Sequence, residues 1–98
     1  MNTRIQSLIG IARGAGKIAT GDAQIEAMLK KRKGFLLIIA EDAQGAQKKY
    51  THWASDLNLP MFVSGTKLEI GHSIGLSPRS AVLILDQGFA KAILLARS

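Results

Sequence analysis

The sequence predicts an α/β fold, a three-layer α/β/α sandwich of about four mixed strands and four to five helices. Two continuous apolar runs, Phe35–Ala40 and Ala81–Leu85, have the length expected of strands that are covered on both faces. Segments with helical periodicity alternate with the strand-like segments along nearly the whole chain, which is typical of α/β folds. With 98 residues, of which 47% are hydrophobic, residues 1–98 are expected to form a single domain.

The first segment is predicted to be a helix from about Asn2 or Thr3 to Arg13. Asn2 or Thr3 can cap its start, and Gly14 with Gly16 ends it. Its apolar residues recur at intervals of three and four, which places them on one stripe: Ile5, Leu8, Ile9 and Ala12. We expect this stripe to face the core.

A short strand, Ile18–Thr20, is predicted to lead into a second helix whose buried residues are Ile25, Met28 and Leu29. Thr20 or Asp22 is expected to be its N-cap, because either side-chain oxygen can accept hydrogen bonds from the first turn. The helix closes with four cations, Lys30–Lys33, which either complement the negative end of the helix dipole or contact phosphate. Gly34 is expected to end it with a positive φ.

The apolar run Phe35–Ala40 is followed by a predicted third helix, with Asp42 as its N-cap. Tyr50 and Trp53 could stack on bases, but they fall in register with the apolar stripe of this helix, which favours packing in the core. The stripe consists of Ala43, Ala46, Tyr50, Trp53 and Leu57. Lys48, Lys49 and His52 lie outside this stripe and are expected to face water or a partner.

The remaining chain predicts two more strands and two more helices. Pro60 ends the third helix before a short strand, Met61–Val63, and a short helix runs from Lys67 to about His72. The loop Leu76–Ser80 leads into the apolar run Ala81–Leu85. Asp86 is expected to cap a last helix with a shared face of Phe89, Ile93 and Ala96.

Composition limits the classes of function. Thirteen Lys and Arg against seven Asp and Glu give a formal charge of +6, which favours a polyanionic partner. The chain has no cysteine, which excludes thiolate zinc sites and cysteine nucleophiles. It also lacks the motifs of serine hydrolases, zinc proteases and phosphate loops, so we expect no enzyme, no metal and no cofactor. Because no segment resembles a secretion signal or a membrane span, a cytoplasmic protein without a membrane partner is expected. The chain is also expected to be a monomer.

Two segments are predicted to form one RNA-contacting rim if they lie at the same end of the sheet: Lys17–Gln24 and the loop Leu76–Ser80. The rim would be flanked by Arg13, Lys17 and Arg79, and an oxygen of Asp22 or Gln24 could accept from a guanine edge. The candidate RNA-binding residues are Arg13, Lys17, Thr20, Gly21, Asp22, Gln24, Leu76, Ser77, Pro78 and Arg79. The alternative is that these turns and caps serve the fold alone.

Four segments in this order carry a family resemblance: 8–21, 36–43, 71–75 and 86–93. Together they resemble the kink-turn-binding ribosomal protein superfamily, which contains the archaeal L7Ae type and the eukaryotic L30e type. The chain is most similar to the small bacterial YlxQ-like branch. The resemblance implies the α/β/α fold and binding of structured RNA, such as a kink-turn in ribosomal or related RNA.

The family's RNA contacts can be carried over residue by residue. A Gly-x-Asn-Glu motif with a lysine three residues after the Glu opens its second helix, and the matching positions here are Gly21, Ala23, Gln24 and Ala27. The glycine is kept, whereas the Asn and the Lys are lost. The family's loop that shelters an extruded nucleotide corresponds to 76–78, and Arg79 adds a cation that could offset the missing lysine. These departures leave open an alternative, a protein–protein interaction module that has lost kink-turn specificity.

Overall fold

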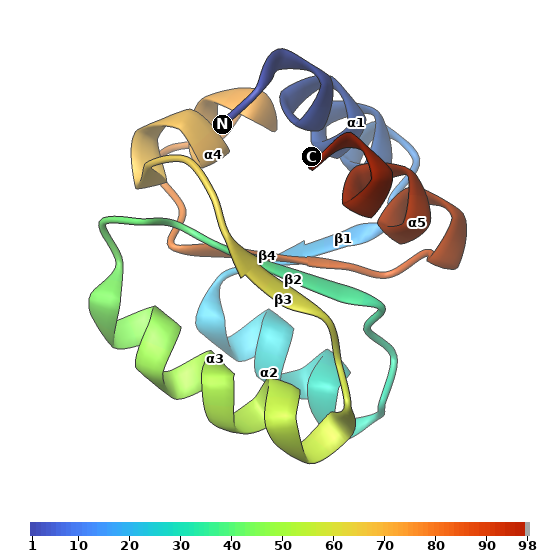
Figure 1. Cartoon of the computed structure of the whole chain (residues 1–98), viewed down its shortest axis with the longest axis vertical. Helices are drawn as coiled ribbons and strands as arrows, with labels where there is room; N and C mark the ends of the chain where they lie inside the picture. The colour runs from blue at the N-terminus through green and yellow to red at the C-terminus, as the bar shows by residue number, and fades with distance from the viewer. Residues whose placement is uncertain (98) are drawn as a thin grey trace.

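The computed structural model describes residues 1–97 and confirms the three-layer α/β/α sandwich with four strands and five helices. Three helices, α1, α4 and α5, cover one face of the sheet, and α2 and α3 cover the other (Figure 1). In chain order the elements are α1 (Thr3–Gly14), β1 (Ile18–Thr20), α2 (Asp22–Lys30), β2 (Leu36–Ile39), α3 (Gln44–Leu57), β3 (Met61–Val63), α4 (Lys67–Ser73), β4 (Ala81–Ile84) and α5 (Gln87–Ala96).

The sheet is mixed, and its strand order is β1-β4-β2-β3. β4 runs antiparallel to both of its neighbours, and β3 runs parallel to β2. Thr20 at the end of β1 pairs with Val82 near the start of β4. The connection that follows β1 therefore lies beside the loop that precedes β4.

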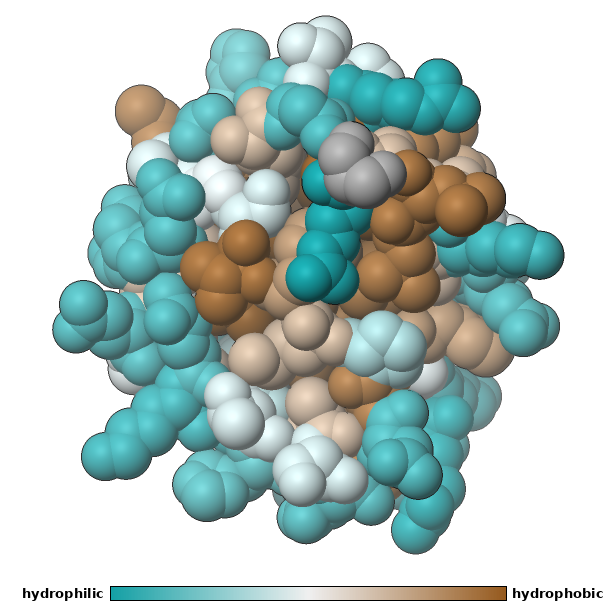
Figure 2. Space-filling view, in the orientation of Figure 1, coloured by the Kyte–Doolittle hydropathy of each residue, from teal (hydrophilic) through white to brown (hydrophobic). Residues whose placement is uncertain are grey.

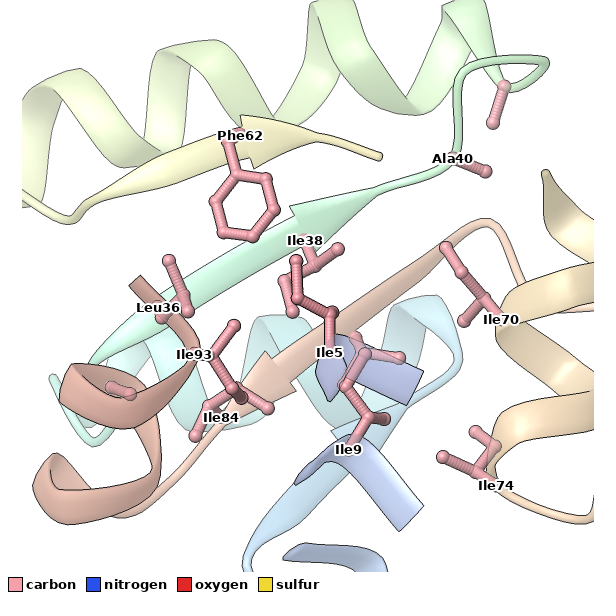
Figure 3. Close-up of a cluster of buried hydrophobic side chains, with 13 residues drawn as sticks. Ile5, Ile9, Leu36, Ile38, Ala40, Phe62, Ile70, Ile74, Ile84 and Ile93 are labelled. Atoms are coloured by element: carbon pink, nitrogen blue, oxygen red, sulfur yellow. The ribbon is translucent and has the colours of Figure 1, made fainter. Parts of the chain in front are cut away.

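Both central strands, β2 and β4, are buried along their whole length, as the two apolar runs predict. On one face they pack against Ile5 and Ile9 of α1, Ile70 of α4 and Ile93 of α5 (Figure 3). On the other face Ile25 and Leu29 of α2 pack with Tyr50 of α3. Tyr50 is completely buried and Trp53 is half-buried against the same cluster, which confirms that both rings belong to the core.

Two of the predicted caps are confirmed. Asn2 caps α1 by accepting from the Ile5 amide at 2.7 Å, and Asp86 caps α5 by accepting from the Phe89 amide at 2.9 Å. Each cap satisfies one of the free N–H groups of the first turn.

Two other predicted caps are wrong. The N-cap of α2 is Gly21, with φ 85° and no side-chain cap, rather than Thr20 or Asp22. The N-cap of α3 is Ala43, because Asp42 turns away and accepts from the Lys67 amide of α4 at 2.8 Å. Both aspartates bond to partners more than 20 residues away in sequence.

The predicted positive φ of Gly34 is also wrong, because the left-handed residue after α2 is Arg32, with φ 56°. The amides of Arg32 and Lys33 donate to the carbonyls of Leu29 and Met28, the pattern in which a helix usually ends on glycine. Gly34 serves a different purpose. A Cβ there would collide with a Cδ1 atom of Leu83, so the chain can approach β4 only without a side chain.

The face that carries the edge strand β3 is largely apolar around its centre. Hydrophobic colours gather there on both sides of one hydrophilic side chain, and hydrophilic residues surround them (Figure 2). Phe62 of β3 is largely buried, and the guanidinium of Arg97 lies 5.0 Å from its ring centroid. Within residues 1–97, no helix is both long enough and apolar enough to cross a bilayer.

Candidate nucleic-acid interface

The β1–α2 connection and the loop before β4 border a single hollow of about 280 Å³. Its walls are Thr20, Gly21, Asp22 and Ile25 from one segment and Pro78, Arg79, Ser80 and Ala81 from the other. The condition for a shared rim, that the two segments meet at the same end of the sheet, is thus met. We call these two segments, 20–25 and 76–81, the rim; the hollow between them lies at the left end of the sheet in Figure 1.

Gly21 is the N-cap residue at which α2 begins in the rim. A Cβ at Gly21 would meet no atom within 4 Å, so glycine is needed there for its φ of 85° rather than for space. Without a side-chain cap at Gly21, amides of the first turn of α2 stay available to a ligand beside the hollow. Gln24 reaches back and accepts from the Thr20 amide at 2.9 Å, which uses one of the two lone pairs of its oxygen.

Asp22 is held at the rim by the core. Its Oδ1 accepts from the buried Tyr50 hydroxyl at 2.6 Å, and its Oδ2 lies 3.8 Å from Lys49 Nζ. Burial first, and then the hydrogen bond to Asp22, raise the pKa of Tyr50. The Asp22 side chain is 64% exposed, so the carboxylate is both fixed and accessible.

The second segment of the rim depends on a close approach to α4. A Cβ on Gly71 would collide with the Ser77 carbonyl oxygen and lie 2.9 Å from Pro78 Cα. Arg79 donates its amide to the Lys67 carbonyl at 3.1 Å, and its Nη1 donates to Ser77 Oγ at 2.6 Å. The loop is therefore braced by backbone contacts with α4 and by its own arginine.

Leu76 differs from the other predicted loop residues in its burial. It is half-buried against the core cluster, whereas Ser77 and Pro78 are exposed. Of the predicted apolar cover, Pro78 is the residue that faces the hollow.

Of the three predicted flanking cations, Arg79 lines the hollow. Lys17 lies at the other end of β1, where its carbonyl accepts from the Leu85 amide, about 10 Å along the strand from Thr20. Arg13 reaches the turn before the loop, and its Nη1 is 3.9 Å from where a Cβ on Gly75 would lie. The structure thus places Arg13 beside the beginning of the loop and Lys17 away from the rim.

Carboxylates surround the rim more closely than the sequence suggests. The Ala40 amide donates to the Ser80 carbonyl at 2.8 Å, which brings Glu41 and Asp42 to the same end of the sheet as Asp22. The cations near these three carboxylates are Lys49, Lys67 and Arg79, so this end carries no excess of positive charge. Among residues 1–97, no group of three His, Asp or Glu side chains is placed to hold a metal ion.

Two residues of this interface were missed from the sequence, Tyr50 and Gly71. The Tyr50 hydroxyl meets Asp22 across 28 residues, and no local pattern signals that contact. Gly71 lies inside α4, where a glycine is unfavourable for a helix, and that cost is the one signal that could have marked a close approach.

Known proteins resemble this chain over most of its length. Residues 3–94 match the family described as the Ribosomal protein L7Ae/L30e/S12e/Gadd45 family. The RNA-binding protein YlxQ of Enterococcus faecium is 35% identical over 89 residues, which are 90% of this chain and 85% of that protein. The RNA-binding protein YlxQ of Bacillus subtilis (strain 168) is 28% identical over 88 residues, 89% of this chain and 88% of that protein.

Solved structures share the fold. A protein with unknown function from Bacillus halodurans C superposes with a TM-score of 0.90 at 25% identity, over 96% of each chain. The 15.5kD RNA binding protein of Giardia lamblia superposes with a TM-score of 0.80 over 99% of this chain and 91% of that one, at 19% identity, and shows the fold alone.

The chain therefore belongs to the L7Ae/L30e/S12e/Gadd45 family of ribosomal proteins. Within that family, its relatives assign it to the bacterial YlxQ-like branch.

Proposed function

We propose that this chain is a non-enzymatic, monomeric RNA-binding protein of the bacterial cytoplasm. Its rim recognises a kink-turn or another structured loop in ribosomal or related RNA. The observation that carries the proposal is the hollow between Gly21 and Pro78, in a family whose YlxQ members are RNA-binding proteins. A protruding base edge would enter the hollow, where Asp22 accepts from it and the first amides of α2 approach its phosphate.

The geometry supports a division of roles at the rim. Asp22 is fixed by the buried Tyr50 and exposes its carboxylate, which suits readout of guanine N1–H and N2–H. The three contacts that brace Arg79 to its own loop all use Nη1, so its other guanidinium donors could bind a phosphate.

The family's missing contacts offer a direct experiment. Ala23 and Ala27 are both exposed on α2, so longer side chains fit at these positions. Restoring the family motif with Ala23→Asn, Gln24→Glu and Ala27→Lys should raise the affinity for a kink-turn RNA at least tenfold, because each good polar base contact contributes about 1 to 3 kcal/mol. Titration against the same RNA and an unkinked duplex of equal length measures both affinity and specificity.

Removing a rim contact tests the same proposal by loss of binding. Arg79→Gln should weaken kink-turn binding and reduce the slope of log K against log salt by about one. Lys48→Gln is the matched control, because Lys48 is exposed on α3 and removes the same charge away from the rim. Micromolar or tighter binding to neither RNA, even at low salt, would refute the proposed function.

A second candidate is a protein–protein interaction module on the same fold. The observation that favours it is the acidic surrounding of the rim, where Glu41 and Asp42 join Asp22. Recovery of a stoichiometric protein partner that survives nuclease treatment would support this candidate over RNA binding.

A further inference from the structure

The positive charge of the chain is concentrated at the end of the sheet opposite the rim. The end of α2 carries four successive cations, Lys30–Lys33, and Lys17 lies beside Leu85 at the same end. With Lys91 of α5 there are six cations against the carboxylates of Asp56 and Asp86, so this end holds a formal +4 of the total +6. This concentration of charge suits a polyanion, and the rim does not use it.

A hollow of about 190 Å³, lined by Arg32 among these cations, lies between the ends of α2 and α3, which are at the lower right of Figure 1. Its walls are apolar on one side, formed by Leu29, Leu57 and Leu59, and polar on the other, formed by Arg32 and Asn58. Small-molecule and cofactor sites usually enclose about 300 to 1,000 Å³, so this hollow is the size for a single planar ring system rather than a cofactor.

Phe35 gives the hollow an aromatic wall. It belongs to the apolar run that predicted a strand, yet β2 begins one residue later, and its side chain is 41% exposed. Phe35 also lines a second apolar hollow with Lys91 and Ala90 of α5. An exposed ring between two hollows, with a cation beside each, is the arrangement on which unpaired bases stack.

Backbone strain is also concentrated here. The two non-glycine residues with positive φ among residues 1–97 are Arg32, at 56°, and Asn58, at 53°, and both line this hollow. Asparagine tolerates the left-handed region, whereas in arginine the Cβ atom crowds the backbone there and costs stability. A glycine at position 32 would end α2 with less backbone strain, so the arginine at this position costs stability. Backbone strain of this kind is concentrated at functional sites.

We propose that this hollow binds one unpaired nucleotide of RNA, with its base on Phe35 and its flanking phosphates on Lys31 and Lys33. Arg32 covers the base with its planar guanidinium, and the Asn58 amide can donate to and accept from the base edge. An acidic peptide would satisfy the cations but has no planar group for Phe35 and Arg32 to stack on. The inference shares its class of ligand with the proposed function but uses a separate surface at the opposite end of the sheet.

The experiment titrates a fluorescently labelled ten-nucleotide uridine oligomer against the natural protein and five variants. Phe35→Leu keeps the apolar volume and removes the ring, so binding should weaken about tenfold, whereas Phe35→Tyr keeps the ring and should bind within twofold of the natural protein. Arg32→Asn tolerates the left-handed backbone and removes the charge. It should also weaken binding about tenfold and lower the salt slope by about 0.7. Lys48→Gln is the charge control, and thermal unfolding confirms that each variant folds.

Four results would overturn the inference, and the fourth concerns Arg79→Gln. The first three are equal binding by Phe35→Leu and the natural protein, an equal loss in Lys48→Gln and Arg32→Asn, and no binding of the oligomer below about 100 µM at low salt. Arg79→Gln separates this inference from the proposed function. If it leaves the oligomer unaffected while Phe35→Leu weakens it, the hollow is an independent site, even when no kink-turn RNA binds to the rim. If Arg79→Gln weakens oligomer binding as much as Phe35→Leu does, this inference fails and the proposed function stands.

Discussion

The hydroxyl of Tyr50 donates a 2.6 Å hydrogen bond to Asp22 Oδ1, joining the middle of α3 to the first residue of α2. The Tyr50 ring is fully buried, while the Asp22 side chain is 64% exposed at the rim. A core residue therefore sets the position of a surface carboxylate. Any change to this bond should be visible in both stability and RNA binding.

Tyr50→Phe should lower the free energy of unfolding by about 1 kcal/mol, because the ring and its packing remain and one hydrogen bond to a partly solvated carboxylate is lost. Urea denaturation of Tyr50→Phe, Asp22→Ala and the double variant measures the coupling between the two residues. Additive losses in the double variant would mean that the bond contributes nothing to stability.

Stability should fall as the pH rises above about 10, the pKa of an unfolded tyrosine. Burial first, and then Asp22, raise the pKa of Tyr50 in the folded protein. The folded state thus keeps a proton that the unfolded state releases, and its advantage is fully present below the unfolded pKa and is lost above it. Tyr50 is the one tyrosine of the chain, so phenolate absorbance reports this group alone. Tyr50→Phe should remove this part of the alkaline loss; an unchanged alkaline profile would contradict the assignment.

Gly71→Ala should destabilise the protein by about 1 to 3 kcal/mol and weaken RNA binding at the rim, because its Cβ would collide with backbone atoms of Ser77 and Pro78. Gly45→Ala is the matched control. It replaces a helical glycine of α3 with no atom within 4 Å of the added Cβ, and it should stabilise by up to about 1 kcal/mol. Thermal unfolding and RNA titration of both variants test this contrast. Equal stability of the two variants would show that the loop yields without cost.

The periodicity of the sequence was sufficient to predict the layers. The apolar runs around Ile38 and Leu83 could be satisfied only by strands covered on both faces, and the helices were marked by stripes such as Ile5 with Ile9. The order of the strands in the sheet could be predicted from the sequence less directly than the layers. From the sequence, the rim depended on the end of β1 and the loop before β4 lying at one end of the sheet, and the pairing of Thr20 with Val82 places them there.

The caps of α2 and α3 could not be predicted, because the aspartates near them bond to partners that are distant in sequence. A local rule assigns Asp22 and Asp42 to the helices they precede, but Tyr50 and the Lys67 amide compete for them across 28 and 25 residues. Local rules likewise give the left-handed residue to Gly34 instead of Arg32, because nothing nearby reveals that Leu83 fills the space above Gly34. The location of the positive charge could not be predicted either, because the net charge of the chain does not say which end of the sheet carries it.

Arg32→Gly should make the protein more stable and a weaker RNA binder. Removing the strain of a left-handed L-residue should stabilise by about 1 to 2 kcal/mol, and the added freedom of an unfolded glycine costs about 0.4 to 1 kcal/mol. A net gain of up to about 1.6 kcal/mol is therefore expected. Asn58→Gly is the control at the matching position of α3, with φ 53°. Asparagine already tolerates this conformation, so the free energy of unfolding of the Asn58→Gly variant should differ little from that of the natural protein.

Urea denaturation should therefore shift to higher midpoints for Arg32→Gly with an unchanged slope, while its binding of the uridine oligomer falls about tenfold with the lost guanidinium. Higher stability combined with weaker RNA binding would show that Arg32 serves a ligand and not the fold. If Arg32→Gly lowered stability, the arginine would be structural, since its side chain would then contribute more packing than its backbone strain costs. If stability rose and oligomer binding were unchanged, the strain at Arg32 would have no role in RNA recognition.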